Sequence, residues 1–303
     1  MKTKAHWNLK SLSSARGVIV LLVGVFFVSW AAILIKSCKS EPTTIAFFRM
    51  FFSTVMVSLA IPFVKGRWFG SKRDLLISIL SGIFLGLHFY TWVAGLMQTS
   101  ISSSVVLVTT QPIFVAILGY VFLREKIGIY GIVAVLLGLA GSFLVAHGDL
   151  GLGRAHLKGD ILSLLGAMFA GGYLFLGRFV RPRVDLIPYV FTVYGVSSAV
   201  ILILGVVTGS FKAPSVNLDY LWFFLLALGP TILGHNLYNF ALRHLPAFPV
   251  GISILGEPIL ATIWGAILFG EKPLFSTLIG GAVIILAIIL VMTRMKPATE
   301  VVS

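Results

Sequence analysis

The sequence predicts an all-α integral membrane protein, with ten transmembrane helices arranged as two inverted five-helix repeats. Three observations lead to this fold class: the composition, the long uncharged runs and an internal repeat. Of the 303 residues, 58% are hydrophobic and 11% are charged, whereas about a quarter of an average soluble chain is charged. This composition excludes soluble domains and a disordered chain. The single cysteine, Cys38, excludes a disulfide scaffold.

Long runs without Asp, Glu, Lys or Arg indicate helices that cross the membrane. The longest run extends from Leu75 to Leu123, and two others cover Leu186–Phe211 and Tyr220–Leu242. One helical crossing takes about 20 residues, so the longest run accommodates two crossings. The strands of a membrane β-barrel would appear as alternating segments of about ten residues. These runs are unbroken and therefore predict helices.

The apolar segments divide the chain into spans, tails and short connections. Basic residues precede the first segment, as in a signal peptide, but its apolar stretch is too long and no small-residue cleavage site follows it. We therefore expect a retained helix there, and every connection is too short to hold a soluble domain. The predicted tails cover 1–16 and 294–303, and a linker loop covers 148–159. The predicted spans lie near 17–36, 44–64, 75–97, 100–122, 128–147, 160–180, 187–209, 220–242, 246–269 and 274–293.

The distribution of Lys and Arg predicts the orientation in the membrane. Sixteen basic residues lie on the side that holds the N-terminus, six lie on the other side, and Arg49 lies within a span. Cytoplasmic loops carry the excess of Lys and Arg. We therefore expect a multi-pass protein of the cell membrane (inner or plasma membrane) with both termini in the cytoplasm. The net charge of +13 is explained by this topology and does not require a nucleic-acid partner.

An internal repeat divides the spans into two halves. Residues 111–126 (QPIFVAILGYVFLREK) align with residues 257–272 (EPILATIWGAILFGEK), and six of the sixteen positions are identical. The predicted halves are 17–147 and 160–293. Because five is an odd number, the halves enter the membrane in opposite orientations, as in secondary transporters whose binding site lies between inverted repeats. The alternative is a gene duplication in a structural membrane protein.

The repeat also carries a family resemblance. The five-plus-five layout and the pattern Pro-x6-Gly-x5-Glu-Lys, at Pro112–Lys126 and Pro258–Lys272, resemble the drug/metabolite transporter (DMT) superfamily and, within it, the EamA-type exporters. The resemblance covers about 17–293. It implies two EamA-like repeats of five helices, a central cavity shared by them, and cytoplasmic termini. The two halves differ at two aligned positions, where Arg124 corresponds to Gly270 and Gln111 corresponds to Glu257. These differences argue against full functional symmetry.

The same resemblance implies a function. It predicts a secondary transporter that exports small metabolites by alternating access through the central cavity, with aromatic or neutral amino acids or related compounds as substrates. Three alternatives stay open. The protein transports drugs or quaternary cations with the same fold, it transports a vitamin, or it is a membrane scaffold that transports nothing.

Polar and aromatic residues within the spans are the candidate substrate-binding residues, because polar groups in a membrane are costly and commonly functional. His88 and Trp92 lie four residues apart and share one helix face, as do His235 and Asn239 on the corresponding span. An aromatic ring can hold a cation or stack on a flat substrate, although packing is the commoner role of such residues. The predicted substrate-binding set is His88, Trp92, Gln111, Tyr173, His235, Asn236, Asn239 and Glu257.

Two ionisable residues within the spans each have two interpretations. Glu257, between Gly256 and Pro258, is the one acidic residue deep in a span. It is a candidate for proton coupling or for binding a substrate amine, and its structural alternative is to cap the backbone at Pro258 or to pair with Arg49. For Arg49, about five residues into the second span, we expect the side chain to extend to the nearest interface.

Glycines on two spans predict close contacts between helices. Gly82 and Gly86 lie four residues apart on the third span, and the sixth span carries glycines at 166, 171, 172 and 177. Small residues at such spacings allow transmembrane helices to approach one another. We interpret these glycines as packing positions.

Sequence motifs of catalysis and metal binding are absent from the chain. It has no HxxxH pair, no cysteine pair, no Walker loop and no GxSxG motif. We therefore expect no enzyme activity, no metal and no cofactor. An enzyme working within the membrane would need clustered ionisable residues, and this sequence scatters them. The expected partners are a small-molecule substrate and the lipid bilayer, without nucleic acid. The sequence does not set the oligomeric state, and a monomer is sufficient.

The predicted orientation can be tested by cysteine labelling. The loops 65–74, 124–126 and 178–185 are expected in the cytoplasm, because they carry nine of the sixteen basic residues on that side. In a Cys38→Ser background, an impermeant thiol reagent should not label a cysteine at Phe69 in intact cells, and it should label one at Ala213. Labelling at position 69 from outside would show that the orientation is wrong.

Overall fold

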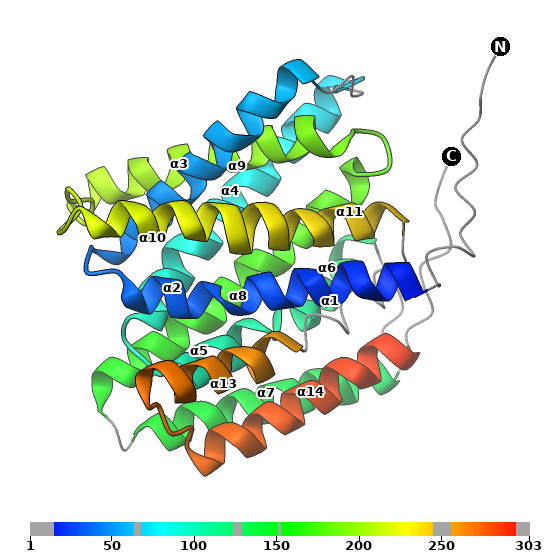
Figure 1. Ribbon diagram of the computed structural model, residues 1–303. Helices are drawn as coiled ribbons and strands as arrows, with labels where there is room; N and C mark the ends of the chain where they lie inside the picture. Colours follow the sequence, from blue (N-terminus) through cyan, green and yellow to red (C-terminus); the bar gives the residue numbers. More distant parts are fainter. Residues whose placement is uncertain (1–14, 64–67, 124–128, 151–152, 245–255, 295–303) are drawn as a thin grey trace.

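The computed structural model of the protein describes residues 15–63, 68–123, 129–150, 153–244 and 256–294. Within these residues the chain is helical throughout and forms no strand, which confirms the predicted all-α class (Figure 1). Seven of the described helices are long and apolar enough to cross a membrane. Three shorter apolar helices, Ile132–Leu144, Gly256–Phe269 and Phe275–Ala287, lie within other predicted spans. The arrangement of ten helices in two repeats stays a prediction.

The helices follow one another through short connections. In order, the elements are α1 (Ala15–Ser29), α2 (Ala31–Ser37), α3 (Pro42–Ala60), the short 3-10 helix η2 (Ile61–Phe63), α4 (Lys72–Leu96), α5 (Ile101–Val108), α6 (Gln111–Leu123), α7 (Ile129–Leu150), α8 (Arg154–Val180), α9 (Leu186–Val207), α10 (Leu218–Leu226), η3 (Ala227–His235), α11 (Asn236–His244), α13 (Gly256–Phe269) and α14 (Phe275–Arg294). Trp30 separates α1 from α2, and these two helices together occupy the first predicted span.

The fourth predicted span, 100–122, is broken in its middle. It consists of α5 and α6, which are separated by Thr109 and Thr110. The hydroxyls of these threonines donate to carbonyls three residues earlier, at 2.8 Å and 2.7 Å, and such bonds compete with the helical backbone ladder. Pro112 follows and has no N–H to donate, which is tolerated in the first turn of a helix. The chain therefore begins a new helix at Gln111.

The eighth predicted span, 220–242, changes its helix type. α10 continues into the π-helix η3, which contains Pro230, and α11 follows. Thr231 donates its hydroxyl hydrogen to the carbonyl of Leu226, five residues earlier, at 3.1 Å. π-helical turns within longer helices are rare and are often found at functional sites. This one ends at His235.

The ninth predicted span, 246–269, is described only from Gly256 onward. α13 begins there, with Glu257 in its first turn, followed directly by Pro258. α6 likewise begins with Gln111 followed by a proline. In both halves, therefore, a polar residue and a proline stand at the start of a helix.

The predicted linker loop over 148–159 is largely helical, which corrects the sequence-based expectation. α7 extends to Leu150, and α8 begins at Arg154. Gly153 precedes α8 with φ of 110°, a conformation that glycine adopts without steric strain. Arg154 and Lys158 are polar and exposed, so the sequence shows a loss of hydropathy here although the helix has already begun.

Glycines allow α4 to lie close to both α8 and α9. A Cβ atom at Gly82 would lie 2.9 Å from the carbonyl oxygen of Val193 on α9, and one at Gly95 would lie 2.7 Å from the carbonyl oxygen of Gly159 on α8. On α8, a Cβ atom at Gly166 would lie 3.0 Å from the Cβ atom of Trp92. The packing role expected for Gly82 and Gly166 is confirmed. α4 is consequently held between two helices of the second half.

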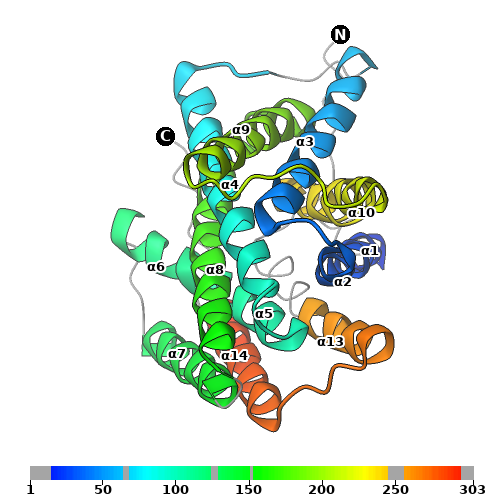
Figure 2. The ribbon, with the colours of Figure 1, turned by 90° about the vertical axis from the view of Figure 1, so that its left-hand side faces the viewer.

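Helices of the first predicted half pack against helices of the second. α3 packs against α9 and α7 against α14, which occupy corresponding spans of the predicted repeat, and α5 packs against α13. The packing of α4 on α8 corresponds in the same way to the packing of η3 on α1. Figure 2 shows α3 beside α9 at one edge of the molecule and α7 beside α14 at the opposite edge. Exchanging the two predicted halves would leave the α3–α9 and α7–α14 contacts unchanged and would interchange the α4–α8 contact with the η3–α1 contact.

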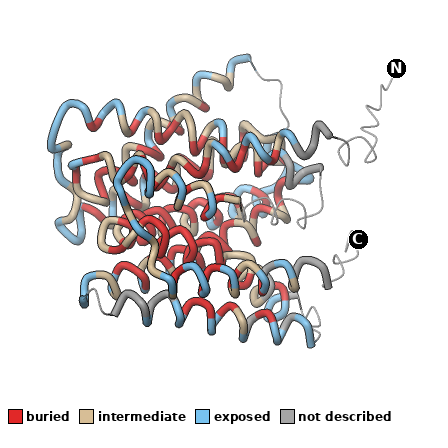
Figure 3. The backbone as a smooth tube through the Cα atoms, turned by 60° about the horizontal axis from the view of Figure 1, so that its bottom comes forward, coloured by how far each residue is buried: buried red, intermediate tan, exposed pale blue. Residues whose placement is uncertain are grey.

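The outward faces of the helices are apolar, as a bilayer requires. Figure 3 shows buried residues concentrated in the middle of the molecule and exposed residues along its outer helices. Val207 and Phe275 are 78% and 77% exposed. Exposed apolar surface of this kind is rare on soluble monomers and marks contact with a membrane or a partner. The exposed large apolar residues also include Leu22, Leu59, Leu76, Phe122, Leu136, Phe143, Ile203 and Ile267.

Polar bonds tie the two halves together at the end of the molecule where α2 meets α3. Asp219 is fully buried and accepts hydrogen bonds from the backbone N–H of Lys39, at 3.1 Å, and from the hydroxyl of Ser40. The hydroxyl of Thr44 donates to the carbonyl of Lys212 at 2.7 Å. The connection before α3 is therefore bound to the connection before α10.

Cys38 lies next to these hydrogen bonds, directly before Lys39, and its reactivity can be tested. Its thiol is 4% exposed and donates to the carbonyl of Leu34 at 3.2 Å. Burial, reinforced by the carboxylate of Asp219, raises the pKa of the Cys38 thiol to about 12. The thiolate is the reactive form, and an ordinary cysteine has a pKa of about 8.5. At pH 7 the thiolate fraction of Cys38 is thus about three thousand times smaller than that of an ordinary cysteine.

We expect iodoacetamide to leave Cys38 unmodified in the folded protein at pH 7 and to modify it after denaturation. The matched control is Gly70→Cys in a Cys38→Ser background, because Gly70 is exposed and a Cβ atom added there would have no neighbouring atom within 4 Å. Between pH 8.5 and 10 the rate at the control should level off, while the rate at Cys38 should continue to rise about tenfold per pH unit. Equal rates at both positions, measured by mass spectrometry, would contradict this assignment.

Candidate functional site

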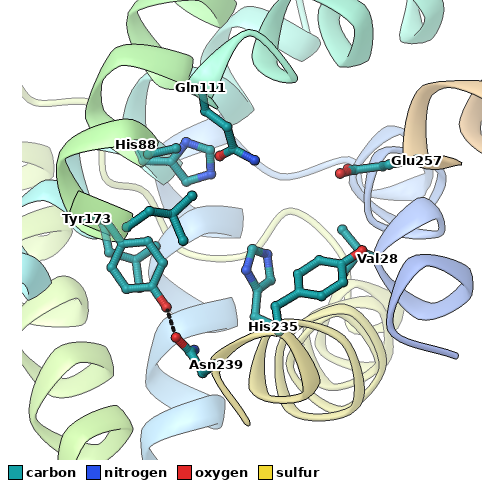
Figure 4. Close-up of a pocket in the computed structure, with 11 residues that line it drawn as sticks. Val28, His88, Gln111, Tyr173, His235, Asn239 and Glu257 are labelled. Atoms are coloured by element: carbon teal, nitrogen blue, oxygen red, sulfur yellow. Dashed lines mark hydrogen bonds between the residues drawn. The ribbon is translucent and has the colours of Figure 1, made fainter. Parts of the chain in front are cut away.

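A cavity lies where the two halves meet, and both halves line it. Its volume is about 30 Å³, which is room for one or two water molecules. The lining comes from α1, α4, α6, α8, η3, α11 and α13. The residues that line it are Val28, Leu85, His88, Gln111, Ala170, Tyr173, Leu174, His235, Tyr238, Asn239 and Glu257 (Figure 4).

Six of the eight predicted substrate-binding residues line this cavity, and the other two, Trp92 and Asn236, do not. The six are His88, Gln111, Tyr173, His235, Asn239 and Glu257. Trp92, which we expected at the cavity, instead stacks on the ring of His88, with ring centroids 5.7 Å apart and an angle of 8° between the planes. Gly166 leaves the space for Trp92 against α8. The amide oxygen of Asn236 accepts a hydrogen bond from the hydroxyl of Tyr194 at 2.6 Å.

The ring of His88 is held in one orientation. Its Nδ1 lies 2.8 Å from the carbonyl oxygen of Gly166. A carbonyl oxygen accepts only, so Nδ1 carries the hydrogen and Nε2 keeps a lone pair. Figure 4 shows His88 beside Gln111, and Glu257 at the other side of the cavity. The cavity therefore offers an imidazole acceptor together with an amide that both donates and accepts.

Tyr173 and Asn239 join α8 to α11 at the cavity wall. The hydroxyl of Tyr173 donates to the amide oxygen of Asn239 at 2.9 Å. The amide nitrogen of Asn239 is buried and has no hydrogen-bond partner among the described residues. Because a buried donor without a partner is costly, Asn239 offers a donor that a bound molecule can satisfy.

Glu257 supplies the carboxylate of the site. It is buried, with 8% of its surface exposed, and it stands in the first turn of α13, where the helix dipole favours a negative charge. Among the described residues it forms no ion pair with Arg49, whose two Nη atoms have no hydrogen-bond partner. The structural alternative in which Glu257 pairs with Arg49 is therefore wrong for this conformation.

Arg49 does not extend to an interface, which corrects the sequence-based expectation. It is 0% exposed, and its Nε donates to the hydroxyl of Thr231 at 2.9 Å. Its Cζ lies 4.2 Å from the ring centroid of Phe89 and 5.9 Å from that of Trp92. α3 presents this residue to α4 and η3 instead of lipid. Arg49 thus lies within the core, beside two aromatic rings that both contact His88 of the cavity lining.

The helix face around Arg49 carried a signal that sequence reasoning missed. The residues one turn away and adjacent on the same face, Ile45, Ala46, Met50 and Ser53, are all 0% exposed, whereas Phe51 is 42% exposed. Small and polar side chains on one face of a membrane helix indicate contact with other helices. The position of Ala46 and Ser53 relative to Arg49 therefore indicated an inward direction.

A second arginine is also buried, although we counted it with the loop charges. Arg181 is 1% exposed, and its Nη1 donates to the carbonyl of Val184 at 2.7 Å. Its Nε donates to the carbonyl of Asn239 at 3.4 Å. Arg183, two residues further, forms an ion pair with Asp74 at 2.6 Å, and this pairing raises the pKa of the Arg183 guanidinium. These bonds fasten the start of α4 and the end of α11 to the connection between α8 and α9.

Comparison with known proteins gives a consistent set of matches. The sequence profile of the EamA-like transporter family matches residues 15–146 and again residues 157–293. Solute carrier family 35 member G1 of Homo sapiens is 26% identical, covering 94% of this chain and 81% of its own. The uncharacterized transporter YdfC of Bacillus subtilis (strain 168) is also 26% identical, covering 87% and 86%.

The fold is shared with a solved structure. One crystal structure superposes with a TM-score of 0.64 at 15% sequence identity, covering 93% of this chain and 98% of its own. A likeness at this level of identity shows a common fold and carries no information on the substrate.

Proposed function

Since this chain belongs to the EamA-like transporter family, we propose that it is a secondary transporter that exports small metabolites. We propose amino acids, aromatic or neutral, or closely related compounds as its substrates. The observation that carries this proposal is the cavity between the halves, with polar groups from both of them. Secondary transporters with inverted repeats bind their substrates between the repeats. In the conformation described here the cavity has room only for water, so a substrate binds in a conformation in which the two halves have moved apart.

The contacts between the halves support an arrangement as two inverted five-helix repeats, 17–147 and 160–293. α3 packs against its counterpart α9, and α7 packs against its counterpart α14. A two-fold axis in the membrane plane relates inverted repeats and produces this kind of pairing. It also gives alternating access a simple basis, because the two halves can exchange their conformations around a shared cavity.

The chemistry of the cavity favours an amphoteric substrate. Glu257 and the Nε2 lone pair of His88 are acceptors for an ammonium group, and the unpartnered amide nitrogen of Asn239 is a donor for a carbonyl or carboxylate. Tyr173 and Tyr238 add aromatic surface. An amino acid presents both an ammonium and a carboxylate group. A drug, a quaternary cation or a vitamin uses only part of this set.

The proposed location is the cell membrane, with both termini in the cytoplasm. The start of α1 and the end of α14 lie at the same end of the bundle in Figure 1. An even number of crossings produces this arrangement, and the excess of Lys and Arg in the flanking loops favours the cytoplasmic side for it. A single chain contains the whole cavity described above, so a monomer is sufficient for transport.

The function can be tested by flux measurements on the purified full-length chain in proteoliposomes. A panel of labelled amino acids, with a quaternary cation and a vitamin included, is offered with and without a pH gradient. We expect at least one aromatic or neutral amino acid to accumulate when a gradient is present, compared with protein-free liposomes. Movement of none of these solutes under any gradient would favour the scaffold alternative.

Proton coupling at Glu257 predicts a separation of two transport modes. Glu257→Gln keeps hydrogen-bonding capacity but cannot take up or release a proton. We expect this variant to lose gradient-driven accumulation by at least about tenfold while it retains exchange of labelled for unlabelled substrate. The matched control is Glu41→Gln, because Glu41 forms an exposed ion pair with Lys212 and should transport as the parent does. Unchanged accumulation in Glu257→Gln would exclude the proton role.

A further inference from the structure

The guanidinium of Arg49 forms no ion pair among the described residues, and the carboxylate of Glu257 acts on it only at longer range. Its Nε is bonded to a neutral hydroxyl, that of Thr231, and its Nη1 and Nη2 have no hydrogen-bond partner there. The rings of Phe89 and Trp92 are its other neighbours. Ring faces attract a cation, but they leave the N–H groups in the guanidinium plane unsatisfied. A buried guanidinium is stable only with an anion or several acceptors.

Several acidic residues outside the cavity are engaged elsewhere, among them Asp160, which accepts a hydrogen bond from the hydroxyl of Thr99 at 2.9 Å. Asp74 is paired with Arg183, and Glu41 with Lys212. Asp219 is bound to the connection before α3, and Glu271 accepts the N–H of Ile101 at 2.8 Å. Glu257 is the one acidic residue that lines the cavity, and it does not contact Arg49. The site therefore holds a cation and an anion that are not paired with each other.

Arg49 lies one side chain behind the cavity wall. The ring of Phe89, which covers the guanidinium, contacts the rings of His88 and His235, with centroids 4.6 Å and 5.9 Å apart. Both histidines line the cavity. A rotation of the Phe89 side chain, or a shift of η3 that moves Thr231 and His235 together, would be needed to bring the Nη atoms to the cavity surface.

We propose that Arg49 binds the carboxylate of the transported molecule. The substrate class is then a small metabolite with a carboxylate group, and for an α-amino acid the ammonium group lies toward Glu257. A guanidinium binds a carboxylate with two parallel N–H···O bonds, which lysine cannot reproduce. The proposal rests on the transport function proposed above and adds to it the group that the site recognises.

The same charge selects against cationic substrates. A quaternary cation in the cavity would lie close to a buried guanidinium, where the low dielectric strengthens repulsion. A carboxamide is uncharged and has only one oxygen, so it cannot accept hydrogen bonds from Nη1 and Nη2 of Arg49 in the way that the two oxygens of a carboxylate can. Recognition by Arg49 therefore predicts that acids are bound better than their amides, and amides better than the corresponding amines.

The test uses the full-length chain and analogues that differ in one group. Four unlabelled probes compete with transport of labelled L-phenylalanine in proteoliposomes: L-phenylalanine, 3-phenylpropionate, L-phenylalaninamide and phenethylamine. Thermal stabilisation of the purified protein by each probe is measured in parallel, so that binding is followed even without flux. We expect L-phenylalanine and 3-phenylpropionate to bind at least about tenfold more tightly than the amide and the amine.

Two variants of Arg49 test whether this residue is the source of the preference for acids over amides and amines. Arg49→Gln should bind L-phenylalanine and its amide equally, and Arg49→Lys should keep a preference for the acid but with at least about tenfold weaker affinity. Arg178→Gln is the matched control, because Arg178 also lies over a phenylalanine ring, 4.7 Å from that of Phe175, but outside the cavity lining. It should discriminate as the parent does. If Arg49→Gln does not fold, the comparison of probes in the parent protein still decides.

The outcomes separate this proposal from the proposed function. Transport of amino acids with equal binding of acid, amide and amine would overturn the role of Arg49 and leave the transport function intact. Retained discrimination in Arg49→Gln would overturn it as well. Binding of 3-phenylpropionate that depends on Arg49, without transport of any amino acid, would support the carboxylate site and contradict the amino-acid substrate.

Discussion

The close packing of α4 between α8 and α9 positions the residues of the cavity. Gly82, Gly95 and Gly166 permit it, because a single added carbon at any of them would meet another helix at 2.7–3.0 Å. This packing directs the face of α4 that carries His88 toward the cavity and holds Trp92 behind it. It also joins the halves, since α4 belongs to the first and both neighbours to the second. The cavity is thus a product of helix packing.

The sequence was sufficient for the helical class and for most of the cavity lining. Hydropathy and charge locate apolar helices well, and the four-residue spacings of polar side chains led to His88, His235 and Asn239. The sequence did not predict that the Arg49 side chain is buried. The direction of a side chain depends on the helix face, and a long side chain near a helix end can reach either the membrane interface or the protein core. The breaks at Thr109 and within η3 were also missed, since apolar flanks on both sides conceal them.

Several of the unsatisfied polar groups lie where the proposed transport takes place, although others, such as the hydroxyl of Ser197, lie away from the cavity. Elsewhere many of the described polar side chains form bonds that fasten loops and helix ends, as Asp219 does between the halves. Around the cavity, Arg49 and Asn239 keep donors without partners among the described residues, and Glu257 is not paired with the buried guanidinium. Such groups cost stability in a folded protein. A substrate that satisfies them gains that free energy on binding, which links the incomplete bonding of the site to its function.

Side-specific accessibility of position 235 tests whether the shared cavity opens alternately to the two sides of the membrane. In a His235→Cys, Cys38→Ser protein reconstituted in liposomes, a small membrane-impermeant thiosulfonate reagent is applied from one side and then, separately, from the other. We expect modification from both sides, each slowed by L-phenylalanine. Modification from one side only, or no protection by L-phenylalanine, would exclude alternating access through this cavity.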